Sequence, residues 1–396
     1  MPLHVGIGLS TDNDPQKAAR ECIRQARENL NFTSFNLAVV FSTLDYAHPT
    51  VFKTIGSLLE NVPILGASSL AIISSQGIFK RGIVILLLAF SEDIHLSTAC
   101  SQDIRSRPIR ETGRQLADRL LSGLKNVPRD FGIFFADGLI PDSSSLLAGI
   151  QERLGRSFPL AGALASDNLA FKKTYLYFNG QVLGDSVCGM LWGGKINFGL
   201  GIKHGWKPLG KPHSVTKSSA NIVYEIDGEP AVKFYEEYLG NEPSRLKSEL
   251  RHISILYPLG IHLKGEEEYL LRNILFINED GSLVFQGDVP QGCVVRLMIG
   301  TKESCLMAAG KAAGEANRGL KGNPAKFALV FNSVSRNILL GRQSVLELET
   351  VKEKLGENTP IIGLYTYGEQ APLKSIGYHG NTYFHNQTIT ILAAEG

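Results

Sequence analysis

Three stretches of the chain repeat one order of apolar and polar positions. In each, a short apolar run ends in phenylalanine, a helical stretch follows, and a second apolar run opens with Pro-x-x-Gly. A repeat of this kind marks one supersecondary unit that buries its apolar face against its neighbours. The chain is therefore predicted to be internally triplicated. The runs are residues 37–41, 132–135 and 327–331, and the motifs are Pro63-Ile64-Leu65-Gly66, Pro159-Leu160-Ala161-Gly162 and Pro360-Ile361-Ile362-Gly363.

Each copy is predicted to run strand, helix, strand, helix, strand, strand. Apolar positions three and four residues apart indicate the helices, and short apolar runs bounded by turn residues indicate the strands. The predicted elements are residues 3–9, 15–30, 36–41, 50–59, 63–73 and 82–90 in the first copy; 94–99, 109–124, 130–135, 143–154, a strand from Pro159 and a hairpin over 174–192 in the second; and 294–299, 304–318, 327–331, 341–355, 360–365 and 381–394 in the third.

Residues 196–291 do not form a full copy. This stretch is rich in turns and short β-type runs, with one predicted helix near residues 230–239. We expect a β-rich insert before the third copy, and a boundary near Gly193-Gly194 that divides the chain into residues 1–194 and 195–396. The predicted class is α/β (α+β), with mixed sheets covered by helices.

Composition excludes several classes of protein. The chain is 43% hydrophobic and 20% charged, and its 40 basic and 38 acidic residues give a net charge of +2. No basic stripe marks a nucleic-acid partner. The longest apolar run, residues 82–90, is far shorter than the ~20 residues that cross a bilayer. The N-terminus has no charged region before an apolar core, so we expect a cytoplasmic protein without membrane insertion.

The five cysteines are odd in number and widely scattered. They form no CxxC pair and no Cys/His cluster with zinc spacing, so no metal site is predicted. Buried free thiols in a reducing compartment are expected. The residues are Cys22, Cys100, Cys188, Cys293 and Cys305.

Short polar residues follow the buried strands of every copy. Ligands gather beyond the carboxyl ends of strands in α/β sheets, because loops converge there. Such residues also cap helices and make turns, and this is the preferred explanation for the first two copies. They include Ser42, Thr43, Asp45, Ser68, Ser69, Asp137, Ser166, Asp167 and Asn168 in those copies, and Asn332 and Ser333 in the third.

The third copy adds groups that recognise charged ligands. Arg336 could pair with a ligand carboxylate, and Glu369 could hold an ammonium group. Tyr365 and Tyr367 alternate along a strand and could wall a pocket. An internal Arg336–Glu369 ion pair is the competing interpretation. The predicted ligand-binding residues are Arg336, Tyr365, Tyr367, Glu369, Asn332 and Ser333, with no catalytic residue.

An ordered set of phrases resembles the FIST family over essentially the whole chain. Residues 63–69 with the following run to Phe90 resemble its N-terminal domain, assigned here to residues 1–194. The C-terminal domain, assigned to residues 195–396, is matched by Asp227-Gly228-Glu229-Pro230-Ala231, Phe234-Tyr235, Tyr238-Leu239, Pro258-Leu259-Gly260, Arg336, Gly363-Leu364-Tyr365-Thr366-Tyr367-Gly368-Glu369 and Phe384-His385-Asn386-Gln387-Thr388.

The resemblance implies an intracellular signal-input module that binds small ligands, with amino acids proposed, and acts through a partner protein. Some members bind haem and sense nitric oxide. Many members carry a cysteine just before the arginine, where this chain has Asn332-Ser333-Val334-Ser335-Arg336, so thiol chemistry there does not carry over.

Three functions therefore remain in view. A stand-alone sensory module for amino acids or similar polar metabolites, with no cofactor, is favoured. A haem-binding nitric-oxide sensor is the first alternative, although His379, His385 and the other histidines lack ligand spacing. A hydrolase or transferase is the second, although no GxSxG elbow or Ser/His/Asp order is present.

Overall fold

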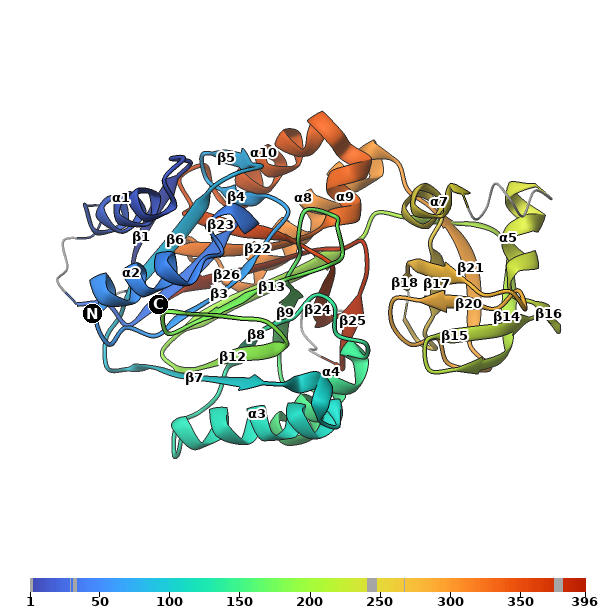
Figure 1. The fold of residues 1–396 in the computed structure, drawn as a ribbon, viewed down its shortest axis with the longest axis horizontal. Coiled ribbons are helices and arrows are strands. Elements are labelled where there is room, and N and C mark those ends of the chain that lie inside the picture. The colour runs from blue at the N-terminus through green and yellow to red at the C-terminus, as the bar shows by residue number, and fades with distance from the viewer. Residues whose placement is uncertain (1–2, 29, 31–33, 241–247, 267, 374–379) are drawn as a thin grey trace.

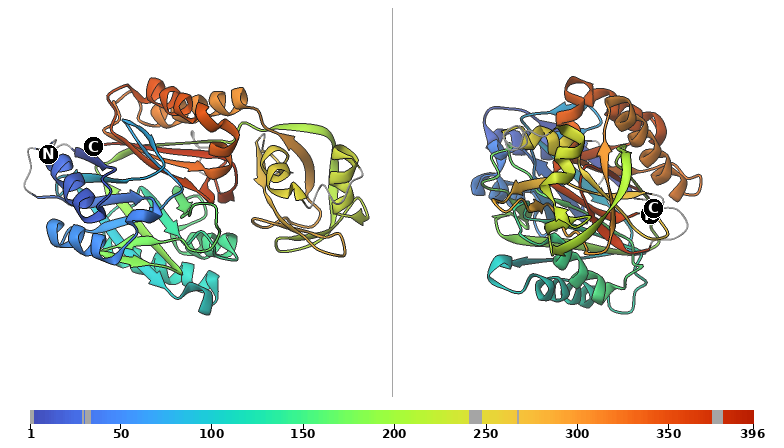
Figure 2. Two further views of the ribbon diagram at one scale, coloured as in Figure 1. Left: turned by 45° about the horizontal axis from the view of Figure 1, so that its top comes forward. Right: turned by 90° about the vertical axis from the view of Figure 1, so that its right-hand side faces the viewer.

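The computed structural model describes residues 3–396 apart from residues 29, 31–33, 241–247, 267 and 374–379. A large three-repeat body and a smaller insert lie side by side, and both chain termini lie at the end of the body away from the insert (Figures 1 and 2). No helix of the described residues is long and apolar enough to cross a membrane.

The body contains three six-stranded sheets with one topology. In each, the second and third strands of a copy pair in parallel and the others pair antiparallel. The first sheet is β1 (His4–Ser10), β6 (Ile83–Ala89), β2 (Leu37–Ser42), β3 (Ile64–Ser68), β10 (Leu176–Phe178) and β11 (Gln181–Leu183). The second is β7 (Ile94–Gln102), β12 (Ser186–Gly194), β8 (Phe131–Ala136), β9 (Leu160–Leu164), β24 (Gly368–Pro372) and β25 (Thr382–His385). The third is β13 (Asn197–Lys203), β26 (Ile389–Glu395), β22 (Phe327–Ser333), β23 (Ile361–Thr366), β4 (Ile72–Ser74) and β5 (Gly77–Phe79).

The copies exchange strands in a closed cycle. Strands β10–β11 of the second copy complete the first sheet, β24–β25 of the third complete the second, and β4–β5 of the first complete the third. The three phenylalanines that end the repeated runs meet in the core that the sheets share. The Phe135 ring packs edge-on against Phe41 at 5.6 Å and against Phe331 at 5.7 Å. The predicted triplication is thus a packed three-part body.

Helices cover the outer face of each sheet (Figure 1). On the third, Gly199 and Gly201 of β13 let the backbone of the covering helix approach closely, since a Cβ on either would meet the carbonyl oxygen of Ala316 or Ala312. The helices are α1 (Pro15–Glu28) and α2 (Pro49–Leu59); α3 (Ile109–Gly123) and α4 (Ser143–Leu154); and α8 (Lys302–Gly319), α9 (Val334–Leu340) and α10 (Ser344–Leu355). Short 3-10 turns are η1 (Leu44–Tyr46), η2 (Ile104–Ser106) and η3 (Gly341–Gln343).

The third copy begins earlier than predicted. Its first strand is β13, and the insert interrupts the copy between β13 and α8. The strand expected to open the copy, β21 (Val294–Ile299), pairs with β14 and β17 inside the insert. The prediction was wrong because β21 is also an apolar run followed by a helix N-cap, Thr301, and so has the local signal of a repeat start.

The insert is built on one eight-stranded sheet with its own apolar core. Its strands in order are β18 (Tyr269–Arg272), β17 (Leu259–His262), β21, β14 (Lys207–Ser219), β15 (Ile222–Ile226), β20 (Leu283–Phe285) and β19 (Ile274–Ile277), with β16 (Glu229–Pro230) beside β15. Helices α5 (Val232–Leu239) and α7 (Leu250–Leu256) belong to it.

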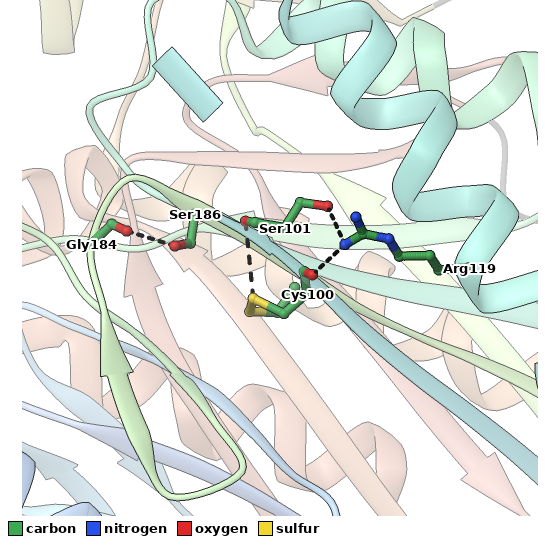
Figure 3. Close-up of a disulfide and its surroundings, with 6 residues drawn as sticks. Cys100, Ser101, Arg119, Gly184 and Ser186 are labelled. Atoms are coloured by element: carbon green, nitrogen blue, oxygen red, sulfur yellow. Dashed lines mark hydrogen bonds between the residues drawn. A yellow bond between two sulfur atoms is a disulfide. The ribbon is translucent and has the colours of Figure 1, made fainter. Parts of the chain in front are cut away.

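A disulfide corrects the expectation of five free thiols. Cys100 of β7 and Cys188 of β12 lie directly opposite each other, with their Cα atoms 4.0 Å apart, and form a bond (Figure 3). Arg119 donates to the carbonyl oxygen of Cys100 at 3.0 Å beside it. The two cysteines are 88 residues apart in sequence, so their spacing gave no sign of the pairing. The other three thiols are free.

Candidate functional site

A cavity of about 680 Å³ lies where the insert meets the third copy. Domain junctions are preferred places for small-molecule sites. The insert supplies Ser248, Leu250, Ser254, Ile255, Asn273, Ile274, Leu275 and Gln286; the third copy supplies Ser333, Val334, Ser335, Ile338, Thr366 and Tyr367; and a loop of the second copy supplies Leu169 and Phe171.

The described wall of the cavity carries no charged side chain. The described lining residues are apolar side chains interspersed with hydroxyl and amide groups, and none is Asp, Glu, Lys, Arg or His. Phe171 and Leu275 are about half exposed at its edge. Such a wall binds the apolar part of a ligand by burial and orients it with a few hydrogen bonds.

Tyr367 connects the second and third copies at the cavity. Its hydroxyl donates to Asp167 Oδ1, and its ring stacks on Phe171 at 4.5 Å. Asp167 also accepts from the backbone N–H groups of Phe171 at 3.1 Å and Lys172 at 2.8 Å. Burial opposes ionisation of Asp167, but these hydrogen bonds hold its pKa below the usual value. The loop is therefore held as a fixed wall.

Arg336 does not line the cavity. Its side chain is fully buried and pairs with Glu347, with Nε donating to Oε1 at 3.0 Å. Its terminal nitrogens donate to the backbone oxygens of His204 and, at 2.8 Å, Cys305. Arg336 thus forms an internal ion pair, but with Glu347; the Arg336–Glu369 pair considered from the sequence is not among the ion pairs of the described residues. A guanidinium so occupied has no place for a ligand carboxylate.

Glu369 lies behind the cavity wall. It accepts from the hydroxyl of Thr366, which lines the cavity, and from Thr388, whose Oγ1 is 2.7 Å away. Burial raises the pKa of this carboxyl to about 8. A group that is fully buried and largely neutral near pH 7 is not placed to hold a ligand ammonium.

The remaining predicted residues divide in the same way. Ser333 lines the cavity. Asn332 instead donates to Glu347 Oε2 at 2.6 Å, and Tyr365 is buried beside Asn337 and Ser344. Of the six predicted residues, Ser333 and Tyr367 thus line the cavity, whereas Arg336, Glu369, Asn332 and Tyr365 form the layer behind it.

Loops from the three copies do meet at the centre of the body, as expected, but they fill the space themselves. Ser68 Oγ donates to the backbone oxygen of Ser166 at 2.9 Å, and Ser69 Oγ donates to that of Tyr365 at 3.1 Å. Ser166 Oγ also donates to Tyr365 O at 2.5 Å. These hydroxyls join one copy to the next.

Hydrogen bonds to β25 and to the residues after it hold the insert against the body. Arg272 Nη1 donates to Phe384 O at 3.0 Å, and the backbone N–H of Asn273 donates to Asn386 Oδ1 at 3.1 Å. Gln387 Nε2 donates to Ser254 O at 2.8 Å. The sequence gave no warning of Ser254 and Asn273 as cavity residues, because no motif marks a residue whose partner lies in a distant segment.

Helix α9 joins the cavity to the segment that leads into the insert. Ser335 and Ile338 lie on its cavity side, whereas Arg336 reaches the carbonyl oxygen of His204. His204 lies between β13 and β14, so it is part of the chain that enters the insert. A displacement of α9 would therefore act directly on the chain segment that enters the insert.

No group of three His, Cys, Asp or Glu in the described chain is placed to hold a metal ion. His385 is buried, with Nε2 2.9 Å from Ala371 O, and burial lowers its pKa to about 3. His379 lies outside the described residues. No described histidine, cysteine or methionine lines the cavity, and the hydroxyl of the lining Tyr367 is engaged by Asp167, so the described wall offers no free axial haem ligand.

Two family models match the chain: the FIST N domain at residues 36–229 and the FIST C domain at residues 231–372. Uncharacterized protein MJ1623 of Methanocaldococcus jannaschii is 25% identical over 307 residues, or 72% of this chain, which spans 58% of that relative. Uncharacterized protein Rv0628c of Mycobacterium tuberculosis is 22% identical over 392 residues, covering 94% of this chain and 95% of the relative.

Among solved structures, a cyanuric acid hydrolase from A. caulinodans has a TM-score of 0.38 at 10% identity, with all of both chains covered. A chorismatase has a TM-score of 0.37 at 9% identity, with 100% of this chain and 99% of that chain covered.

Proposed function

The chain belongs to the FIST family, whose domains are signal-transduction sensory domains, and we propose that it senses a small uncharged molecule bound between the insert and the third copy. The observation that carries this proposal is the cavity of about 680 Å³ whose walls come from the insert, the third copy and a loop of the second. A ligand there touches parts of the molecule that are also joined by hydrogen bonds and by an apolar cluster that includes Trp206, Met298 and Leu340.

The lining supports the choice of ligand. An amino acid carries two charges, and burying either one without a partner is costly. The described wall offers no charged side chain, and Arg336 is occupied by Glu347. We therefore favour a neutral molecule with an apolar body and one or two hydrogen-bonding groups over the amino acids expected from the sequence.

The proposed output is a change in how the insert lies against the body. A ligand shifts such an equilibrium only by its differential affinity for the two arrangements. Contact with Ser335 and Ile338 on one side and Ile274 and Leu275 on the other would make affinity depend on the insert's position. A signalling partner protein would then read the position of the insert.

The lining also supports binding over catalysis. Ser333, Ser335 and Ser254 supply hydroxyls, but no described lining residue is a histidine, lysine or carboxylate that could act as a base toward them. Among the described lining residues no nucleophile is paired with a base, and this favours binding over a hydrolase or transferase.

The test measures neutral-ligand binding in a variant with a filled cavity. N-phenyl-1-naphthylamine is an uncharged fluorescent probe of suitable size, and a panel of neutral metabolites and amino acids can be screened in parallel by thermal shift. We expect the probe and at least one neutral metabolite to bind the parent, and Ile338→Trp to weaken both at least tenfold. Leu346→Trp is the control, because Leu346 is 45% exposed on α10 and outside the cavity.

Two results would end the proposal. One is no stabilisation by any neutral compound at millimolar concentration. The other is equal binding by the parent and a folded Ile338→Trp protein. Stabilisation by amino acids alone, abolished by Ile338→Trp, would keep the site but overturn the neutral ligand class.

A further inference from the structure

A second cavity, of about 320 Å³, lies on another side of the contact between insert and body. Its walls come from helix α4 of the second copy, the insert around β17 and β18, and strand β25 of the third copy. It shares no lining residue with the cavity of the proposed function. The lining is Arg110, Ser144, Leu147, Ala148, Gln151, Glu152, Arg156, Ile261, Leu263, Leu270, Arg272, Asp288, Pro290, Asn381, Thr382, Tyr383 and Phe384.

Arg272 brings a buried positive charge to this cavity. Its side chain is almost entirely buried, and it donates through Nε to Asp288 O at 2.9 Å and through Nη1 to Phe384 O at 3.0 Å. All its hydrogen-bond acceptors in the described chain are backbone carbonyl oxygens, and no described carboxylate lies within 4.0 Å of it. Burial lowers its pKa to about 10, so it remains cationic near pH 7. A buried cation without a paired anion is costly, and a bound anion would offset that cost.

Thr382 brings an unpartnered hydroxyl to the same wall. It is 3% exposed on β25, and its buried Oγ1 has no hydrogen-bond partner within the described residues. A buried hydroxyl without a partner loses its hydration without compensation. The cavity thus combines an unpaired cation with an unused hydrogen-bond donor.

The other charged groups of the described wall form no ion pair with Arg272. Arg110 and Glu152 pair with each other. Asp288 faces the cavity and attracts Arg272 without lying within ion-pair distance of it, while burial and the nearby Asp142 raise the pKa of the Asp288 carboxyl. The remaining wall is largely apolar and includes Leu147, Leu263, Leu270, Tyr383 and Phe384.

We propose that this cavity binds a small carboxylate with an apolar body. The carboxylate would accept hydrogen bonds from Arg272 and Thr382, and the body would pack against Leu270 and Phe384. A dianion such as phosphate is less suitable, because the negative charge of Asp288 would repel the second negative charge of the ligand. The site differs in place and ligand class from the larger cavity lined by Ser333 and Tyr367 (the neutral cavity), so the protein would bind two compounds on different sides of the contact between insert and body.

The first test compares three probes on the full chain by calorimetry. These are 4-methylpentanoate, its uncharged analogue 4-methylpentanamide, and inorganic phosphate. We expect the carboxylate to bind, the amide to bind at least tenfold more weakly, and phosphate not to displace the carboxylate. No carboxylate binding at 10 mM, or equal binding of the amide, would overturn the proposal. Tighter binding of phosphate would overturn the carboxylate class.

The second test uses two matched threonines. Thr382→Val should weaken the binding of 4-methylpentanoate about tenfold, which is the effect of one lost hydrogen bond to a charged group. Folding stability should not fall, because the Thr382 hydroxyl has no partner in the described chain. Thr390 is the control, since its Oγ1 is also buried and unpartnered in the described chain but lies outside this cavity. Thr390→Val should bind like the parent. Equal binding by both variants would refute the assigned contact.

The two proposed sites can fail independently. Ile338→Trp, which fills the neutral cavity, should leave 4-methylpentanoate binding unchanged. If Ile338→Trp abolishes carboxylate binding while Thr382→Val does not, the carboxylate binds in the neutral cavity and this inference is wrong.

Discussion

Removal of the Arg336 guanidinium separates a structural role from a ligand-binding role. Arg336→Met keeps much of the apolar side chain but leaves the buried Glu347 carboxylate without its cation. It also removes the hydrogen bonds to the backbone oxygens of His204 and Cys305. We expect a large loss of folding stability, with little effect on binding of a neutral probe.

The magnitude follows from the burial of both partners. The side chains of Arg336 and Glu347 are 0% and 2% exposed, so water cannot replace the lost partner. Removing one partner from a buried ion pair costs about 3–5 kcal/mol. This is a large share of the ~5–15 kcal/mol by which folded proteins are usually stable. Arg336→Met/Glu347→Leu removes both charges and should regain most of the loss, because the Glu347 charge is no longer stranded.

Urea unfolding and probe binding measured on the same samples provide the assay. Arg342→Met is the control, since Arg342 is exposed next to the same helix and should change stability by only a few tenths of a kcal/mol. A loss below about 1 kcal/mol for Arg336→Met would refute the stability argument. A folded, fully stable Arg336→Met protein that no longer binds would restore the ligand-binding role predicted from the sequence.

Three further predictions concern other polar or covalent contacts. Burial raises the pKa of Glu369 from 4.5 to about 8, so the native state holds this proton more tightly than the unfolded state, and folding stability should fall as pH rises from about 4.5 to 8. Glu369→Gln should flatten that part of a Tm-against-pH curve. An unchanged slope would contradict the assignment. Tyr367→Phe removes the hydrogen bond to Asp167, so it should lower folding stability by about 1–3 kcal/mol and speed amide exchange in the second-copy loop. Unchanged exchange would show that the loop is held without this hydrogen bond. The Cys100–Cys188 disulfide joins residues 88 positions apart, so its reduction should lower folding stability by about 2–4 kcal/mol. The control is Cys188→Ser, whose stability should not change on addition of reductant.

The repeats were predictable because their signals are local. Each apolar run, helix and Pro-x-x-Gly strand follows from the order of neighbouring residues, and the three phenylalanines meet as the triplication implies. The strand exchange was not predictable, because β4–β5 could pair with the equivalent edge of any copy. The start of the third copy was misplaced for a related reason: β13 and β21 have similar local patterns, and only their pairing partners distinguish them.

The candidate site was predictable by region more than by role. The cavity of about 680 Å³ borders the third copy, and Ser333 and Tyr367 line it. Arg336 was assigned to a ligand because its acid partner could not be identified: Glu347 is 11 residues away on α10 and gives no pairing signal in sequence. Burial decides whether a charged residue binds a ligand or balances another charge, and burial depends on contacts between distant segments.

Insertion into one copy explains why a cavity borders the loops of the third repeat. The first and second copies pass from first strand to first helix through short connections, and their serine loops are filled by contacts between copies. In the third copy, the chain leaves after β13, forms the insert and returns at α8. The insert then lies over the loops that follow β22 and β23, and it turns an exposed end of the sheet into a cavity wall. Because Arg336 holds the chain where it enters the insert, the group that makes this copy distinctive in sequence also connects the cavity-lining helix α9 to the insert.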